Sequence, residues 1–128
     1  MVRNKINFYV ISLVIILLGQ ITKFYFSKSI NTGAAFGILK SYNLFLIIIS
    51  LIIICIVAYY LYKSNDFLVN LGFSFILGGA LSNLFDRIFF GGVRDFIDFL
   101  LIPSFNLADA FNVTGALIII FYLLKNKE

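Results

Sequence analysis

The sequence predicts an all-α membrane protein with four transmembrane helices. Hydrophobic residues make up 62% of the 128-residue chain and charged residues only 12%, whereas an ordinary soluble domain has roughly 45–50% and about 25%. Four apolar stretches each approach the roughly 20 residues that a helix needs to cross a bilayer. A single proline is available to interrupt them. These observations indicate one integral membrane domain covering residues 1–128.

Polar residues bound each expected span. The spans are expected at residues 8–26, 43–62, 67–85 and 106–124. The first follows Arg3 and Lys5 like the core of a secretory signal peptide, but its length and the lack of a small-residue cleavage site favour a retained helix. The third contains small residues that let neighbouring helices approach closely, namely Gly72, Gly78, Gly79 and Ala80.

Two longer polar connections separate these spans. Residues 27–42 are too few and too mixed to cross a membrane, so we expect short strands or a re-entrant flap at one membrane face. Residues 86–105 form an expected loop with three of the six acidic residues and the only proline, Pro103. Four spans place both termini on one side of the membrane and both connections on the other.

The distribution of Lys and Arg does not fix the orientation. One side carries Arg3, Lys5, Lys63, Lys125 and Lys127, and the other carries Lys23, Lys28, Lys40, Arg87 and Arg94. If function holds Lys23, Arg87 and Arg94 in place, the remaining charges favour cytoplasmic termini.

Composition excludes several classes of function. The ten basic residues never form the cluster that phosphate binding requires, so no nucleic acid partner is expected, and an anionic lipid surface accounts for the net charge of +4. Cys55 is the only cysteine, which rules out an internal disulfide, and we expect it to pack within its span. The absence of histidine excludes Ser-His-Asp and Cys-His catalysis and histidine metal sites. Neither a metal ion nor another cofactor is expected.

Two aspartates are the candidate catalytic groups. Asp109 lies about one turn into the fourth span, three residues after Asn106, so the two side chains share a helix face near the membrane boundary. Asp95 lies in the connection over the same end of the bundle. Two carboxylates held close together cannot easily both ionise, so one can activate water while the other polarises a scissile carbonyl. The alternative is that Asp95, Asp98 and Asp109 only mark the interface; for Asp98 a helper or solvated role is favoured.

Other polar residues near this end allow two interpretations each. Asn83 and Arg87 are one helical turn apart and can form a hydrogen-bonded pair that orients the loop, or Arg87 extends to the membrane interface as a solvated charge. Lys23 with Gln20 allows the same two interpretations.

The segment NTGAAFG, residues 31–37, places small residues around one aromatic and one amide. With Asn31, Gly33 and Phe36, it suits backbone contact with an extended peptide. A flexible loop without a ligand is the alternative.

Four motifs, NTGAAFGIL, GGALSNLFDRI, GGVRDFIDF and FNLADAF, occur in this order. They closely resemble the motifs of lipoprotein signal peptidase, also called signal peptidase II. The resemblance implies a catalytic dyad of Asp95 and Asp109. It also implies supporting roles for Asn31, Asn83, Arg87 and Asn106, with Gly78 and Gly79 in the second motif.

Two positions depart from the family pattern. The family's first motif usually has Asp before Gln-x-Thr-Lys, whereas this chain has Gly19 before Gln20, so Lys23 lacks that partner. Arg94 stands where a small apolar residue is common, and we expect its charge to lower the pKa of Asp95.

The resemblance implies that the chain cleaves the signal peptide from a membrane-bound prolipoprotein, immediately before a cysteine that carries diacylglycerol. Such an enzyme would be a multi-pass protein of the bacterial cytoplasmic membrane, surrounded by membrane lipids, with its dyad at the extracytoplasmic face. Residues 27–42 would be a flap over the scissile bond. We expect the enzyme to act as a monomer.

The residues alone leave two other functions open. A Ser-Lys peptidase would use Ser29 with Lys28 or Lys23, although neighbouring positions in a polar loop make poor dyad geometry. A small transporter or membrane chaperone would bind protons or cations at its aspartates. Against this, Asp95 lies in a connection and Asp109 lies near a helix end, not at the midplane.

Overall fold

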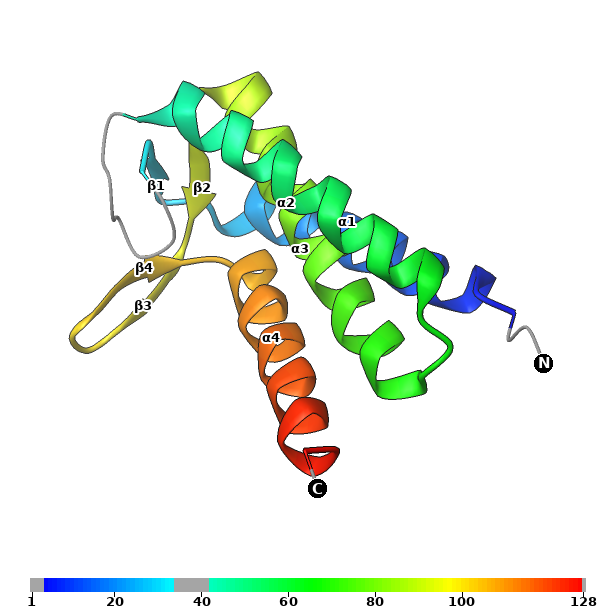
Figure 1. Ribbon diagram of the computed structural model, residues 1–128. Helices are drawn as coiled ribbons and strands as arrows, with labels where there is room; N and C mark the ends of the chain where they lie inside the picture. The colour runs from blue at the N-terminus through cyan, green and yellow to red at the C-terminus, as the bar shows by residue number, and fades with distance from the viewer. Residues whose placement is uncertain (1–3, 34–41, 128) are drawn as a thin grey trace.

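The computed structural model describes residues 4–33 and 42–127, and its elements follow the order expected of a four-span protein (Figure 1). The helices are α1 (Ile6–Phe26), α2 (Asn43–Lys63), α3 (Phe67–Phe90) and α4 (Leu107–Lys125). The strands are β1 (Ser29–Asn31), β2 (Val93–Asp95), β3 (Ile97–Phe99) and β4 (Ile102–Phe105). All four helices of the described ranges are long and apolar enough to cross a membrane, which confirms the predicted fold class.

Helix α3 lies at the centre of the bundle and packs against each of the other three helices (Figure 1). Small residues bring α3 and α4 close together. A Cβ atom added at Gly115 would lie 2.6 Å from the carbonyl oxygen of Gly72, and one added at Gly79 would lie 2.6 Å from that of Ala108. The backbones of the two helices therefore meet at two levels, as small residues permit in membrane proteins.

The distribution of polar and apolar side chains is the reverse of that in a water-soluble protein. The outer surfaces of the helices expose large apolar side chains such as Leu13 and Ile52, while Lys23 and Asp86 are completely buried. Lipid accommodates the apolar surface, and the buried polar groups need partners inside. Cys55 lies on the exposed surface of α2, so the packing role expected for it is wrong. Because α2 is apolar on all sides, its hydrophobicity does not reveal which face is buried.

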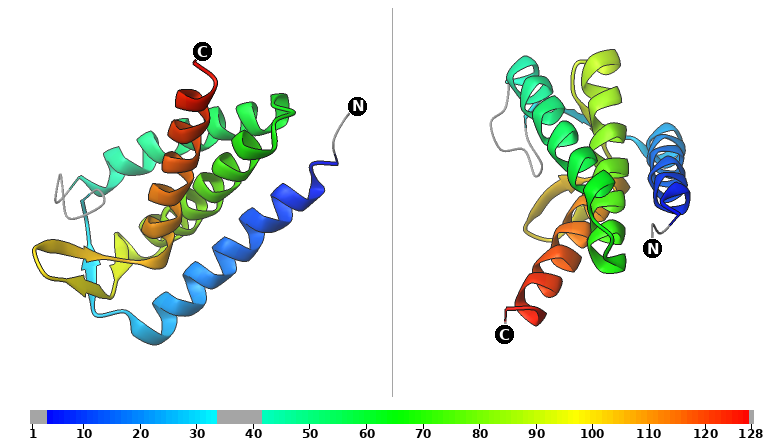
Figure 2. Two further views of the ribbon diagram at one scale, coloured as in Figure 1. Left: turned by 90° about the horizontal axis from the view of Figure 1, so that it is seen from below. Right: turned by 45° about the vertical axis from the view of Figure 1, so that its right-hand side comes forward.

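The strands lie at the end of the bundle opposite the two termini (Figure 2). β1 pairs antiparallel with β2, with Ser29 opposite Asp95. β3 and β4 form a separate antiparallel hairpin. Short strands were one of the two structures expected for residues 27–42, and the described part of that segment confirms them. The rest of the expected flap, residues 34–41 with Phe36, lies outside the described residues.

Helix α3 is longer than the sequence indicates. It continues past the expected end at residue 85 to Phe90 and stops at Gly91, which adopts a left-handed φ of 72°. Asp86 and Arg87 therefore lie in a helix and not in a loop. Two consecutive charges suggested the end of a span, but a helix can continue through them because both side chains find partners inside the protein.

The absence of a side chain at Gly19 leaves room for Ser82. A Cβ atom added at Gly19 would lie 2.4 Å from Ser82 Oγ. We expect Gly19→Ala to lower the free energy of unfolding by about 1–3 kcal/mol, the usual cost of overpacking. Thermal denaturation of the purified protein in detergent measures this loss.

The matched variant is Ser82→Ala, which removes the hydroxyl that the new methyl group meets. The double variant should lose less stability than the sum of the two single losses, because the two substitutions affect one contact. Strictly additive losses would show that the two side chains do not compete for the same space.

Candidate active site

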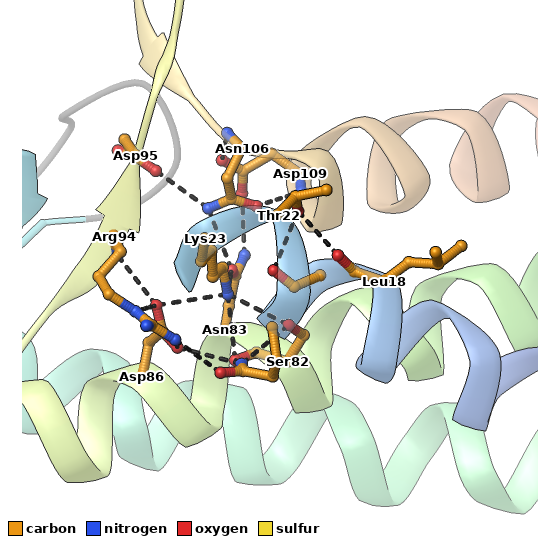
Figure 3. Close-up of polar contacts among 12 residues, drawn as sticks. Leu18, Thr22, Lys23, Ser82, Asn83, Asp86, Arg94, Asp95, Asn106 and Asp109 are labelled. Carbon is orange, nitrogen blue, oxygen red and sulfur yellow. Dashed lines mark hydrogen bonds and ion pairs between the residues drawn. The ribbon is translucent and has the colours of Figure 1, made fainter. Parts of the chain in front are cut away.

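A polar cluster lies where β2 ends and α4 begins (Figure 3). Asp95 is the last residue of β2 and is 2% exposed, and Asp109, in the first turn of α4, is 6% exposed. Asn106 caps α4. Its side-chain oxygen accepts a hydrogen bond from the Asp109 N–H at 3.0 Å, and the Asp109 carboxylate accepts one from the Asn106 N–H at 3.1 Å. This reciprocal cap fixes the Asp109 side chain at the helix start.

Asn106 also connects the two aspartates. Its Nδ2 donates to Asp95 Oδ1 at 2.9 Å and to Asn83 Oδ1 at 3.2 Å. Asn83 Nδ2 in turn donates to Asp109 Oδ1 at 2.9 Å. Two amide side chains thus orient both carboxylates, and the structure brings Asp95 and Asp109 to one place.

A buried ion network holds β2 against α3. The fully buried Asp86 pairs with Lys23 at 3.4 Å and with the Arg94 guanidinium at 3.0 Å. It also accepts hydrogen bonds from the Arg94 backbone N–H at 3.0 Å and from Arg94 Nε at 3.1 Å. Arg94 donates further to Gln20 at 2.6 Å, and its guanidinium lies 4.1 Å from the ring centroid of Phe90. The network therefore joins α1, α3 and β2.

The expected effect of Arg94 on Asp95 is wrong. Neighbouring side chains of a strand point to opposite faces, so Arg94 is directed toward Asp86 while Asp95 faces Asn106 (Figure 3). The sequence does not reveal that these residues form a strand, and residues adjacent in a strand do not face each other.

Lys23 has partners even though position 19 is glycine. Besides its ion pair, its ammonium donates to Ser82 Oγ at 3.1 Å and to Asn83 Oδ1 at 3.0 Å. Gln20 Nε2 donates to the Ser82 carbonyl at 3.0 Å. Lys23 and Gln20 are therefore part of the cluster and are not charges or amides at the lipid interface.

Arg87 forms different contacts from the expected pair with Asn83. Its guanidinium donates to Asn43 Oδ1 at 3.2 Å and to the Gly33 carbonyl, while Asn43 Nδ2 donates to the Arg87 carbonyl at 3.0 Å. Arg87 is 7% exposed, so it does not extend to the interface. It ties the start of α2 and the residues after β1 to α3. Asn43 was not identified from the sequence, because a polar residue is usual at the start of a span.

A cavity of about 340 Å³ opens beside the two aspartates. Its polar end is formed by Asn31, Asn83, Arg87, Asp95 and Asp109. Its apolar walls come from α2 and α3 and include Leu46, Ile49, Ile53, Ile76 and Ala80. The arrangement suits a ligand with one polar and one apolar part. Gly79, another residue singled out from the sequence, instead lies at the close contact between α3 and α4.

Two further polar residues, Ser50 of α2 and Asn112 of α4, line the cavity among the apolar walls. The sequence alone does not single them out. For Asn112, the spacing in the sequence indicates a place near the site, because it follows Asp109 by three residues and therefore shares its helix face.

Burial raises the pKa of Asp95 to about 6. The charge of Asp109 adds to the increase, whereas hydrogen bonds from Asn106 and Asn31 and the charge of Lys23 stabilise the ionised form and limit it. Asp95 therefore changes protonation state near neutral pH.

Asp98 lies apart from this cluster. It pairs with Lys28 at 3.6 Å, and the two side chains are 61% and 67% exposed. Asp98 is therefore a solvated charge of the β3–β4 hairpin. Within residues 4–33 and 42–127, no group of three or more His, Cys, Asp or Glu side chains could hold a metal ion.

Fold and site together place the chain among bacterial membrane enzymes. One solved bacterial membrane enzyme superposes on it with a TM-score of 0.87 at 29% identity, covering 95% of this chain and 90% of the other. A second superposes with a TM-score of 0.81 at 30% identity, covering 94% of each chain.

Sequence comparison identifies the particular family. Residues 2–125 match the Signal peptidase (SPase) II family, and the chain belongs to that family. The lipoprotein signal peptidase of Halothermothrix orenii is 37% identical over 94% of this chain and 97% of that protein. That of Caldicellulosiruptor bescii is 50% identical over 74% of this chain, an alignment that spans 63% of the relative's length. The family resemblance of the four motifs is confirmed.

Replacing Asp86 tests the ion network. Asp86→Asn leaves Lys23 and Arg94 without their carboxylate in the protein interior, so we expect the free energy of unfolding to fall by about 3–5 kcal/mol. Arg94→Met keeps the pair of Lys23 and Asp86 and should cost less. Thermal denaturation in one detergent compares the variants. If the two variants lost equal free energy of unfolding, Asp86 would not be the residue that pairs with both cations.

Proposed function

We propose that this chain is an aspartic endopeptidase that removes the signal peptides of diacylglyceryl-modified prolipoproteins, cleaving before the lipidated cysteine. The observation that carries the proposal is the pair of buried carboxylates, Asp95 and Asp109, joined by Asn106 at the polar end of an apolar cavity. Membership of the signal peptidase II family supports this substrate class, as do relatives named lipoprotein signal peptidase.

In the proposed reaction Asp95 and Asp109 share one proton. The ionised carboxylate takes a proton from water, whose oxygen attacks the scissile carbonyl carbon, while the protonated carboxyl donates its proton to the carbonyl oxygen. The tetrahedral intermediate then collapses. The carbon–nitrogen bond breaks, the dyad protonates the departing amine of the cysteine, and the released signal peptide keeps the new carboxylate.

The neighbouring side chains position this dyad. Asn83 and Asn106 hydrogen-bond to each other and each binds a carboxylate, so both acids are fixed before a substrate arrives. Arg87 holds Gly33 beside the cavity. Because β1 and β2 border the cavity through Asn31 and Val93, an extended peptide can lie along them.

The cavity matches the expected position of a lipidated substrate in the membrane. A cysteine that carries diacylglycerol lies at the membrane interface with its acyl chains in the lipid, and the cavity has the same arrangement, with polar groups at one end and apolar walls between helices. We place the termini in the cytoplasm of a bacterial cell and the aspartates at the extracytoplasmic face. Membrane lipids surround the chain, which acts as a monomer.

Substitution of the dyad tests the proposal. Asp95→Asn and Asp109→Asn should each lower kcat by about 10³-fold or more, because each removes an acid or base that no neighbour replaces. The assay is mass spectrometry of a diacylglyceryl model prolipoprotein incubated with the pure protein in detergent.

Asp98→Asn is the matched control. It makes the same change at an exposed carboxylate and should leave cleavage within about twofold, as surface substitutions usually do. Unchanged thermal denaturation shows that the variants are folded. Full activity of either folded dyad variant would refute the mechanism, and failure of the unaltered protein to cleave any diacylglyceryl substrate would refute the function.

The pH dependence tests the role of Asn106. The profile of kcat/KM should show an ionisation near pH 6, where Asp95 titrates. Asn106→Ser keeps a residue that can cap α4 but removes the donor that stabilises ionised Asp95. The pKa of Asp95 should therefore rise, and the ionisation should move to higher pH by up to about one unit. A shift to lower pH would contradict the assigned hydrogen bond.

A further inference from the structure

The half-buried Asn112 side chain lines the cavity and carries one buried polar atom that has no partner within the described part of the chain. Its Oδ1 is buried and has no hydrogen-bond partner among the described residues. It packs against Gly79, where an added Cβ would lie 2.3 Å from it. An unsatisfied amide at this depth costs free energy that an apolar residue would avoid. The cavity that Asn112 lines offers a place for the missing partner.

Asn112 lies at a defined distance from the dyad. It follows Asp109 by three residues on the same face of α4, which places it about 4.5 Å further along the helix axis. An extended peptide advances about 3.3 Å per residue. A substrate whose scissile bond lies at Asp109 would therefore present to Asn112 the backbone within about two residues of that bond.

The chemistry of an amide favours a peptide over a lipid as its partner. A carboxamide has an oxygen that accepts and a nitrogen that donates, which is the complement of a backbone peptide group. The orphaned atom is an acceptor, so it needs a donor. Acyl chains have no hydrogen-bonding group, and glycerol esters have only acceptors. A backbone N–H is a donor, and one that leaves a helix at membrane depth has no water to bind.

We infer that Asn112 is a substrate-binding residue that hydrogen-bonds one backbone amide of the signal-peptide segment immediately preceding the scissile bond. The inference rests on the proposed function. The signal peptide must be extended at the dyad, because a helical segment would shield the scissile carbonyl from attack. The backbone amide at the end of the signal-peptide helix therefore loses its intrahelical hydrogen bond, and the Asn112 side chain accepts a hydrogen bond from that amide instead.

The experiment combines a protein variant with altered substrates. Asn112→Leu keeps the approximate volume of the side chain and removes its hydrogen-bonding atoms. On the substrate, each of the three residues before the scissile bond is incorporated in turn through a backbone ester, which replaces one N–H by oxygen. Cleavage of each diacylglyceryl peptide by both proteins gives kcat and KM.

We expect Asn112→Leu to lower kcat/KM for the all-amide substrate by about tenfold, the value of one hydrogen bond of about 1.4 kcal/mol. One ester position should cause a similar loss with the unaltered protein and none with Asn112→Leu, because both changes remove the same bond. Equal activity of the two proteins on every substrate, or losses that multiply at every position, would overturn the inference.

A dialkylglyceryl substrate, with ether in place of ester linkages, tests the lipid as the partner. If the effect of Asn112→Leu disappears with that substrate and persists with every backbone ester, Asn112 binds the lipid carbonyl and the inference is wrong. Thr114→Val is the control on the outer face of α4, where Thr114 is exposed, and it should change kcat/KM by less than about twofold. The backbone-ester series on the unaltered protein tests the inference even if Asn112→Leu does not fold: the absence of one sensitive position would refute it.

Discussion

The buried network of Lys23, Asp86 and Arg94 is the interaction on which the rest of the site depends. Removing each of these charges from water costs several kcal/mol, and the cost is offset only when every charge has its partner in good geometry. The three residues come from α1, α3 and β2. All three charges are paired only when α1, α3 and β2 come together, so the network favours this arrangement of the elements.

That selected arrangement determines where the dyad forms. Strand alternation directs Asp95 away from the ion network that holds Arg94, so anchoring one residue presents the other to the cavity. Different contacts position Asp109, namely the reciprocal hydrogen bonds with Asn106 at the start of α4. Asn106 contributes to the position of both aspartates, because it caps the helix and also donates to Asp95. The dyad is therefore held by a helix end and a strand, which the Phe96 N–H to Phe105 carbonyl hydrogen bond also joins.

The sequence predicts those parts of the structure that depend on local patterns. The four spans follow from hydrophobicity, and the proximity of Asn106 and Asp109 follows from their spacing. The pairing of β1 with β2 is not predictable in this way, because it joins segments far apart in a chain whose short strands carry no clear alternation. The partner of Lys23 is not predictable for the same reason: the sequence pattern places Asp86 in a loop, and its burial depends on contacts with α1 and β2.

Gly19 and Arg94 make sense as parts of one arrangement. A side chain at position 19 would meet Ser82 Oγ, which here accepts a hydrogen bond from Lys23. The glycine thus admits the hydroxyl that, with Asp86, satisfies the lysine in the absence of the carboxylate usual in the family's first motif. Asp86 then has capacity for a second cation, since a carboxylate can accept several hydrogen bonds. Arg94 fills that capacity with its guanidinium and its backbone N–H. Gly19 thus leaves Lys23 with Asp86 as its carboxylate partner, and Arg94 supplies the bonds to Asp86 that fasten β2, and with it Asp95, to the bundle.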